Sequence, residues 1–260
     1  MDQTLADDLQ LALSIAKKAN EQSMARFRAL DLEVTTKPDR SPVTDADKSV
    51  ENIIREELAK LRPNDSIIGE EFGTSGDSER VWIIDPIDGT ANFLRGVPVW
   101  ATLIGLRVDG KYVLGVVSAP AMHRTWWAAV GQGAFTEDVD STVRAISVSS
   151  VKNIADASFS FSSIELWQQS GQLENLLAIS EHVWRTRAYG DFWSHMLVAE
   201  GVVDISAEND LKIYDWAALA PIVNEAGGIF RDQSGQLNDK TSSVMASNGL
   251  LDSDLAKLLA

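Results

Sequence analysis

The chain has 260 residues, 45 % of them hydrophobic, so it is long enough to bury a sizeable core in one large or two small domains. Its formal net charge of −15 argues against nucleic acids and anionic membranes as partners, and it would repel an anionic substrate unless bound cations reversed the local field. Cysteine is absent, which excludes disulfides, thiolate zinc sites and cysteine nucleophiles. Because the N-terminus is unlike a signal peptide and no apolar run approaches the ~18 residues of a membrane span, we expect a soluble cytoplasmic protein.

Helices precede strands in the first half of the chain. Apolar residues at helical spacing predict a long helix over residues 4–30, and Thr44-Asp45 predicts the start of a second helix that ends near residue 61. Strands are expected at five places, the last three as an antiparallel meander: 66–68, 81–84, 101–108, 112–118 and 125–130.

The second half mixes helices and strands throughout. Asp215 is expected to cap one helix, which Gly227-Gly228 ends. The predicted helices are 166–181, 192–200, 215–225 and 251–259, and the predicted strands are 157–161, 203–205 and 229–231. Because there is no repeat, low-complexity tract or long linker, we predict one α/β domain over 1–260 with two lobes, approximately 1–145 and 146–260.

The run WIIDPIDGTANF at residues 82–93 is the most informative stretch of the chain. Three β-prone residues lead into Asp85 and Asp88, and Gly89-Thr90 then opens a predicted helix. Hard divalent cations take oxygen ligands, and a helix N-terminus favours an anion. The run therefore predicts adjacent metal and phosphate sites, whereas a strand ending in a polar turn explains only a single Asp-Gly pair.

Carboxylates recur at the junctions between predicted strands and helices: Asp47, Glu70, Asp85, Asp88 and Asp215. If these groups converge, their repulsion raises their pKa values strongly, and bound cations remove that penalty. All-oxygen ligation with few protein ligands per ion predicts Mg²⁺, with Mn²⁺ as a substitute.

Together these segments resemble the inositol monophosphatase family of magnesium-dependent, lithium-sensitive phosphatases. The resemblance rests on WIIDPIDGTANF and on IYDWAALAPIVNEAGG at 213–228, and it extends across nearly the whole chain. Supporting matches are Lys37 with residues 41–47, and the segments 68–71 and 131–135. The resemblance implies a layered αβαβα sandwich, a homodimer, and a small phosphate ester as substrate.

The resemblance also implies a set of metal ligands. Glu70, Asp85 and the backbone carbonyl of Ile87 would hold one Mg²⁺. Asp85 would bridge to a second ion, which Asp88 and Asp215 also bind, and a third ion would depend on Glu70 and waters. Two such ions act as a clamp on the attacking and leaving oxygens.

Phosphate binding and catalysis are assigned by the same resemblance. Asp88 and the amides of Gly89 and Thr90 would lie against the phosphate at the helix start. Thr90 and Asp47, with Glu70 as the third catalytic residue, would orient and deprotonate a metal-bound water that attacks phosphorus in line. An aspartyl-phosphate route is disfavoured because Asp85 lacks the second aspartate, two residues later, of the usual Asp-x-Asp pair.

The segment RAYGDFW at 187–193 departs from inositol monophosphatases and looks like the histidinol-phosphatase branch of the family, which hydrolyses L-histidinol phosphate in histidine biosynthesis. That substrate carries an ammonium group and an imidazole, so its non-reacting end favours carboxylates. We therefore expect Asp191 and Glu208 to bind it, with Asn209 assisting. Arg187 is a further candidate, at the substrate site or at a subunit contact.

Other interpretations remain open at this point. The same metal site suits an inositol-1-phosphate or broad sugar-phosphate phosphatase, and a chain without catalysis would be a metal-binding regulatory protein. Asp191 also suits a helix N-cap, Glu208 suits an exposed position, and Lys37 is either a neighbour of the metal cluster or a surface residue. An aromatic wall for imidazole, or simply core, is expected from Trp184, Trp193 and Trp216.

Overall fold

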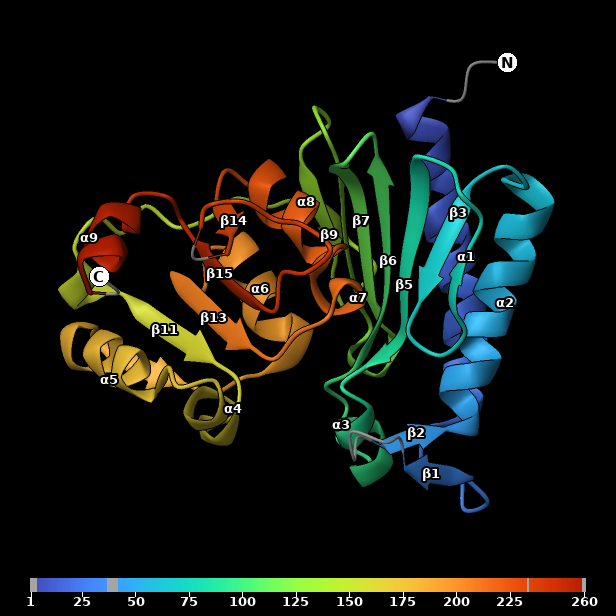
Figure 1. Cartoon of the computed structure of the whole chain (residues 1–260), viewed down its shortest axis with the longest axis horizontal. Helices are drawn as coiled ribbons and strands as arrows, with labels where there is room; N and C mark the ends of the chain where they lie inside the picture. The colour runs from blue at the N-terminus through green and yellow to red at the C-terminus, as the bar shows by residue number, and fades with distance from the viewer. Residues whose placement is uncertain (1–3, 37–41, 233, 259–260) are drawn as a thin grey trace.

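The computed structural model describes residues 4–36, 42–232 and 234–258, and their elements form five layers (Figure 1). On one side α1 (Leu5–Arg26) and α2 (Asp45–Leu61) cover an eight-stranded sheet. Between this sheet and a five-stranded sheet lie α6 (Asp191–Ala199), α7 (Ile213–Trp216) and α8 (Leu219–Glu225). The far face of the small sheet is covered by α4 (Ile164–Gln169), α5 (Leu173–His182) and α9 (Asp252–Leu258). This order confirms the predicted αβαβα sandwich.

The large sheet has the strand order β10-β9-β8-β7-β6-β5-β3-β4. Its strands are β3 (Ser66–Gly69), β4 (Gly73–Ser75), β5 (Arg80–Asp88), β6 (Ala101–Val108), β7 (Lys111–Ala119), β8 (Arg124–Ala129), β9 (Ala134–Glu137) and β10 (Val143–Ala145). β5 runs parallel to β3 and antiparallel to β6, and β6, β7 and β8 form the predicted antiparallel meander. The strand β5 thus lies inside the sheet, with both edges paired.

The small sheet has the order β12-β11-β13-β15-β14. Its strands are β11 (Ser158–Phe161), β12 (Arg185–Arg187), β13 (Ile205–Asn209), β14 (Ile229–Arg231) and β15 (Ser243–Ser247). The remaining elements are a β1–β2 pair (Val34–Thr36, Pro42–Thr44), α3 (Thr90–Arg95) and two 3₁₀ turns, η1 (Pro120–Met122) and η2 (Ile154–Asp156). A strand was expected over 203–205, but β13 starts at Ile205 and continues to Asn209. Glu208 and Asn209 are therefore its last two residues.

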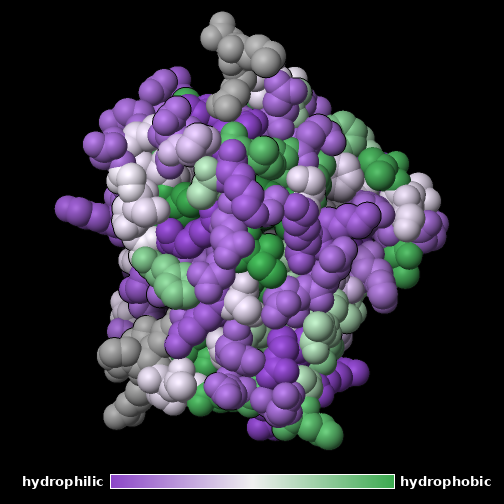
Figure 2. Space-filling model, turned by 90° about the vertical axis from the view of Figure 1, so that its right-hand side faces the viewer, coloured by the Kyte–Doolittle hydropathy of each residue, from purple (hydrophilic) through white to green (hydrophobic). Residues whose placement is uncertain are grey.

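Alternation along β5 explains how the large sheet is buried on both faces. Trp82 and Ile84 pack under α1 and α2, whereas Ile83 faces the central helices and packs in the cluster that contains Trp216. The outward face of the molecule on the side of α1 and α2 is mainly hydrophilic, with scattered hydrophobic residues (Figure 2). Within the described residues, no helix has the length and apolar character that crossing a bilayer requires.

Helix boundaries correct three of the sequence predictions. The first helix ends at Arg26 rather than near residue 30. The single helix predicted over 166–181 is two helices, because Gly171 adopts φ +71° between α4 and α5. The helix predicted over 215–225 is likewise divided into α7 and α8, and Asp215 is the third residue of α7 rather than its cap.

A pair of glycines sets the distance between the large sheet and the central helices. Gly105 of β6 and Gly115 of β7 are cross-strand partners. A Cβ added at Gly115 would lie 1.9 Å from the backbone oxygen of Ala218, and one at Gly105 would lie 3.1 Å from the backbone of Ala217. The chain between α7 and α8 therefore rests directly on the sheet, and this contact holds Asp215 close to the end of β5.

Substitution of Gly115 by alanine is expected to destabilise the protein by about 2 kcal/mol or more, because backbone must move to admit the methyl group. For a chain of this size each kcal/mol corresponds to roughly 2–4 °C of melting temperature. Thermal unfolding of Gly115→Ala beside Gly105→Ala tests this, since the second site is less crowded and should cost less. Equal stability of Gly115→Ala and the unmodified protein would contradict the close contact.

Candidate active site

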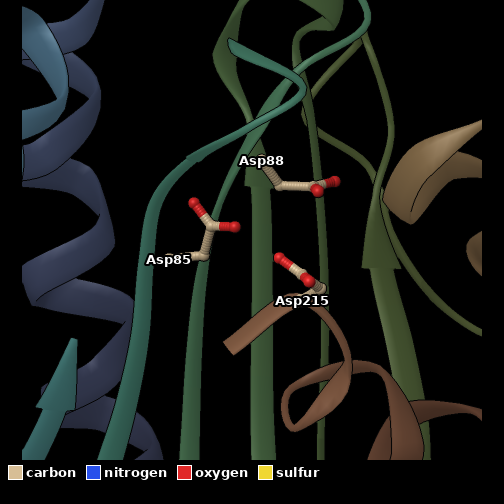
Figure 3. Close-up of side chains that lie close together, drawn as sticks. All are labelled: Asp85, Asp88 and Asp215. Atoms are coloured by element: carbon tan, nitrogen blue, oxygen red, sulfur yellow. The ribbon is translucent and has the colours of Figure 1, made fainter. Parts of the chain in front are cut away.

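Asp85 and Asp88 stand at the end of β5 and face the same side of it (Figure 3). On a regular strand, residues three apart face opposite sides. The pairing of β5 with β6 shifts register between Asp85 and Asp88, and this irregularity brings both carboxylates together. The local sequence Pro86-Ile87 at the shift is thus part of the site's construction.

Asp215 reaches the same place from α7, in the second half of the chain. Its Oδ2 accepts a hydrogen bond from the Lys212 backbone N–H at 2.6 Å, which fixes the first turn of α7. Asp85, Asp88 and Asp215 each offer a carboxylate oxygen, and these oxygens lie within 4.8 Å of one another (Figure 3). Three carboxylates from two distant segments of the sequence therefore form one cluster.

The electrostatics of this cluster are those of a cation site. Burial raises the pKa values of Asp85 and Asp88 well above the ordinary range, and their acidic neighbours raise them further. Burial raises the pKa of Asp215 to about 7, and Glu70 and Glu208 add to the shift, although the Lys212 hydrogen bond opposes it. Such groups favour protons or a cation, and an all-oxygen donor set fits a hard divalent ion.

Glu70 and Asp47 border the cluster. Glu70 follows β3, is half-buried, and its charge raises the pKa values of Asp85 and Asp47. Asp47 is buried as the third residue of α2, where its Oδ2 accepts from the Thr44 N–H at 2.8 Å and from the Thr44 hydroxyl at 2.5 Å. This capping arrangement leaves the other oxygen of Asp47 directed away from the helix end.

The second oxygen of Asp47 meets Thr90 at the start of α3. Thr90 Oγ1 lies 3.2 Å from Asp47 Oδ1 and 3.0 Å from the carbonyl oxygen of Ile87. Since one hydroxyl has one proton, it donates to one of these acceptors at a time. Gly89 precedes it at φ +84°, where a Cβ would lie 3.0 Å from the Val99 oxygen, so only glycine fits this turn without strain.

Asp191 joins the site from the second half of the chain. It is the first residue of α6, after Gly190 at the N-cap, which excludes the N-cap interpretation of Asp191. Its Oδ2 accepts from Asn92 Nδ2 at 2.9 Å, and the neighbouring Phe192 N–H donates to Asp88 Oδ2 at 2.8 Å. Burial, reinforced by the charge of Glu208, raises the pKa of Asp191 to about 7.

Glu208 and Asn209 lie buried on β13 rather than on the surface. The charge of Glu208 raises the pKa values of Asp88, Asp191 and Asp215, so its carboxylate lies near all three. Glu208 Oε1 and Asn209 Nδ2 are buried and have no hydrogen-bond partner among the described residues. Buried polar atoms of this kind usually have a ligand or water to bind.

Other candidates lie apart from the cluster. Arg187 is exposed at the end of β12, and its guanidinium donates to the Thr186 carbonyl at 2.7 Å. Lys37 and Ser41 lie outside the described residues. The three tryptophans differ: Trp184 is exposed, Trp216 is core against Tyr112, and half-buried Trp193 has an indole N–H without a partner in the described part of the chain.

Two residues of the site were missed by the sequence analysis. Asn92, which holds Asp191, stands inside the run WIIDPIDGTANF, and its place there is a signal that could have suggested a role. His195, whose Nε2 lies 3.3 Å from Glu208 Oε2, is one helical turn after Asp191, and that i,i+4 spacing could have pointed to it.

Comparison with known proteins agrees with the fold and the cluster. The model of the inositol monophosphatase family matches residues 4–260. The chain belongs to this family. The crystal structure of the suhB protein of Bartonella henselae superposes on this chain with a TM-score of 0.87 at 31 % sequence identity. The match covers 96 % of this chain and 97 % of the suhB chain, so both sheets belong to the shared fold.

Two similar proteins carry a more specific name, histidinol-phosphatase. A histidinol-phosphatase of Streptomyces coelicolor is 51 % identical over 253 residues, covering 96 % of this chain and 95 % of the relative. A histidinol-phosphatase of Mycobacterium tuberculosis is 52 % identical over 246 residues, covering 94 % of this chain and 95 % of the relative.

Proposed function

We propose that this protein is a Mg²⁺-dependent phosphomonoesterase that hydrolyses L-histidinol phosphate to L-histidinol and phosphate in histidine biosynthesis. The observation that carries the proposal is the pair of half-buried Asp191 and buried Glu208 beside the acidic cluster. The likeness to two histidinol-phosphatases at about half identity supports the same substrate. A homodimer in the cytoplasm belongs to the proposal, as the family resemblance and the sequence imply.

The acidic cluster would hold the metal. Glu70, Asp85, Asp88, Asp215 and the Ile87 carbonyl are the proposed ligands of two or three ions, with Mn²⁺ as a substitute. Bound Mg²⁺ would supply the positive charge that neutralises the phosphate ester and lowers the pKa of an attacking water. The charge pattern supports this, because a buried cluster of carboxylates is stabilised by a cation and also repels an anionic ester without one.

The chain's own groups around the phosphate would position it and take a proton. The amides of Gly89 and Thr90 at the start of α3 would donate to phosphate oxygens, with Asp88 beside them. The Thr90 hydroxyl, 3.2 Å from Asp47 Oδ1, would orient the attacking water and pass its proton to that carboxylate. Burial raises the pKa of Asp47, which improves it as a proton acceptor.

The far end of the substrate would meet Asp191 and Glu208. Histidinol phosphate ends in an ammonium group and an imidazole, both of which donate hydrogen bonds, and both carboxylates accept them. Burial and the charge of Glu208 raise the pKa of Asp191, so a cationic ligand beside the two carboxylates is favoured. An inositol ring offers hydroxyl groups and no charge to this pair.

Phosphate release from three esters with Mg²⁺ tests the proposal: histidinol phosphate, inositol 1-phosphate and fructose 1,6-bisphosphate. We expect histidinol phosphate to have the highest kcat/KM. A clear preference for inositol 1-phosphate would contradict the proposed substrate, and no Mg²⁺-stimulated hydrolysis of any ester would favour a non-catalytic, metal-binding protein.

Asp191→Asn is expected to lower kcat/KM for histidinol phosphate by roughly ten- to a hundredfold, the effect of a lost charge-assisted hydrogen bond. The asparagine oxygen can still accept from Asn92 Nδ2, so the start of α6 should persist. Steady-state kinetics on histidinol phosphate and on p-nitrophenyl phosphate, which has no cationic end, measure the loss of selectivity.

Asp210→Asn is the matched control for this variant. Asp210 is exposed and directly follows Glu208 and Asn209 of β13. Like Asp191, it has a positive φ. The substitution removes one negative charge outside the proposed site. Selectivity for histidinol phosphate over p-nitrophenyl phosphate should therefore stay within about twofold of that of the unmodified protein. If Asp191→Asn lowers turnover of both esters equally, Asp191 is structural.

A further inference from the structure

His195 is a fully buried side chain inside the layer between α6 and the small sheet. Its Nε2 lies 3.3 Å from Glu208 Oε2, and its ring packs against Phe230 with ring centroids 5.3 Å apart. Asp191 lies four residues earlier on the same helix, about one turn away. One face of α6 thus bears a proposed substrate residue and a side chain that contacts the other proposed substrate residue.

The contact has a defined direction. With Glu208 ionised, its carboxylate only accepts, so His195 Nε2–H donates to Glu208 Oε2. The other oxygen, Oε1, is buried and has no hydrogen-bond partner within the described residues. His195 therefore occupies one oxygen of Glu208 and leaves the second available.

Glu208 lies where a fixed orientation matters. Its charge acts on Asp88, Asp191 and Asp215, which places its carboxylate beside the acidic cluster. α6 has a separate polar contact to the small sheet, because Ser194 Oγ lies 2.8 Å from Ser160 Oγ of β11. Attachment of α6 therefore does not depend on His195 alone, and the histidine acts on the direction of one glutamate.

We propose that His195 is a positioning residue for substrate selectivity: it holds Glu208 Oε2 so that Oε1 is presented to the cationic end of the phosphate ester. This inference rests on the proposed function and deepens it, because it assigns the orientation of Glu208 to a side chain that does not itself touch substrate. The pair works as one unit, in which the histidine contributes only through the glutamate.

His195→Met and His195→Gln test this assignment. Methionine has no donor, so its ratio of kcat/KM on histidinol phosphate to kcat/KM on p-nitrophenyl phosphate should fall about tenfold, mainly through KM for histidinol phosphate; tenfold corresponds to about 1.4 kcal/mol. Glutamine keeps an N–H donor of similar reach and should restore the ratio to within about threefold. Because both esters are assayed on one preparation, a smaller folded fraction leaves the ratio unchanged.

A second readout is binding of the product L-histidinol, measured by calorimetry, which should weaken about tenfold in His195→Met and recover in His195→Gln. In a Glu208→Gln background, where the carboxylate charge is already absent, His195→Met should change the ratio by less than about twofold. A full tenfold change in that background, or equal losses on both esters in the single variant, would overturn the proposal and leave His195 a structural residue.

Failure of the proposed function gives a different result. If the unmodified protein does not hydrolyse histidinol phosphate, the substrate assignment is wrong, and the same cycle is measured on the ester that it prefers. Non-additive effects of His195→Met and Glu208→Gln on KM for that ester support the positioning role, and additive effects overturn it.

Discussion

Asp85→Asn is expected to lower kcat by at least about a thousandfold and at the same time to raise the melting temperature of the metal-free protein. Asp85 is buried beside Glu70, Asp88 and Asp215, and asparagine removes a charge that neighbours all three. Loss of a proposed bridging ligand removes charge stabilisation worth several kcal/mol in the transition state. Without metal, the same substitution relieves repulsion in a buried site.

Asparagine has nearly the same shape as aspartate, so the local structure should persist. In the unmodified protein the Ile87 N–H donates to Asp85 Oδ1 at 3.0 Å, and the asparagine oxygen can still accept this hydrogen bond. The measurements are kcat with Mg²⁺ and thermal unfolding with a chelator. A matched control is Asp65→Asn, near the N-terminal end of β5 and away from the cluster. There Asp65 Oδ1 lies 3.3 Å from Arg80 Nε, and Oδ2 accepts a hydrogen bond from Trp82 Nε1. That variant should melt lower and keep its activity, so an Asp85→Asn protein that behaves likewise would contradict the cation site.

Removal of metal is expected to abolish activity and to make stability fall as pH rises. The pKa values of Asp191 and Asp215 are about 7 in the folded protein, and those of Asp85 and Asp88 are also raised, against about 3.9 for aspartate in an unfolded chain. At a pH between the unfolded and the folded pKa, the folded state binds more protons than the unfolded state. The free energy of unfolding therefore decreases as pH rises from about 4 to 7. With several coupled groups the loss is on the order of several kcal/mol.

Melting temperatures at pH 5 and pH 8 measure this, each with a chelator and with Mg²⁺. For this chain length we expect a fall on the order of 10 °C between the two pH values in chelator, and recovery by Mg²⁺ at pH 8 but little effect at pH 5. Asp215→Asn should flatten the chelator curve. Acids with lowered pKa values elsewhere, such as exposed Asp7 and half-buried Glu57, act with the opposite sign but below about pH 4, outside this window. A chelator curve that rises towards pH 8 would refute the cluster's electrostatics.

Local patterns identified the parts of the site that lie close in sequence. Asp85, Asp88, Gly89 and Thr90 share one run, so strand, turn and helix could be placed from twelve residues, and the structure brings them together with Asp215. Their roles as ligands stay a prediction. The αβαβα order came from the family resemblance, since hydrophobic periodicity alone locates elements without ordering the layers.

Contacts between distant segments were beyond the reach of the sequence. Asn92 and Asp191 are 99 residues apart, and the donor and acceptor types that join them suit many other partners. Glu208 was expected to bind the cationic end of the substrate, but its place on a strand was not predicted, because the expected strand stopped at residue 205. The break at Gly171 was missed because one glycine inside an apolar helical pattern is often tolerated.

The two sheets divide the work of the site between them. Asp85 and Asp88 belong to a strand of the large sheet, whereas Glu208 belongs to the small sheet and Asp191 to the helix packed on it. Each sheet has its own hydrogen-bonded framework, so a substitution around Glu208 leaves the pairing of β5 intact. A change of phosphate ester therefore requires substitutions only around Glu208 and Asp191, while the acidic cluster, to which the second half contributes Asp215, stays as it is.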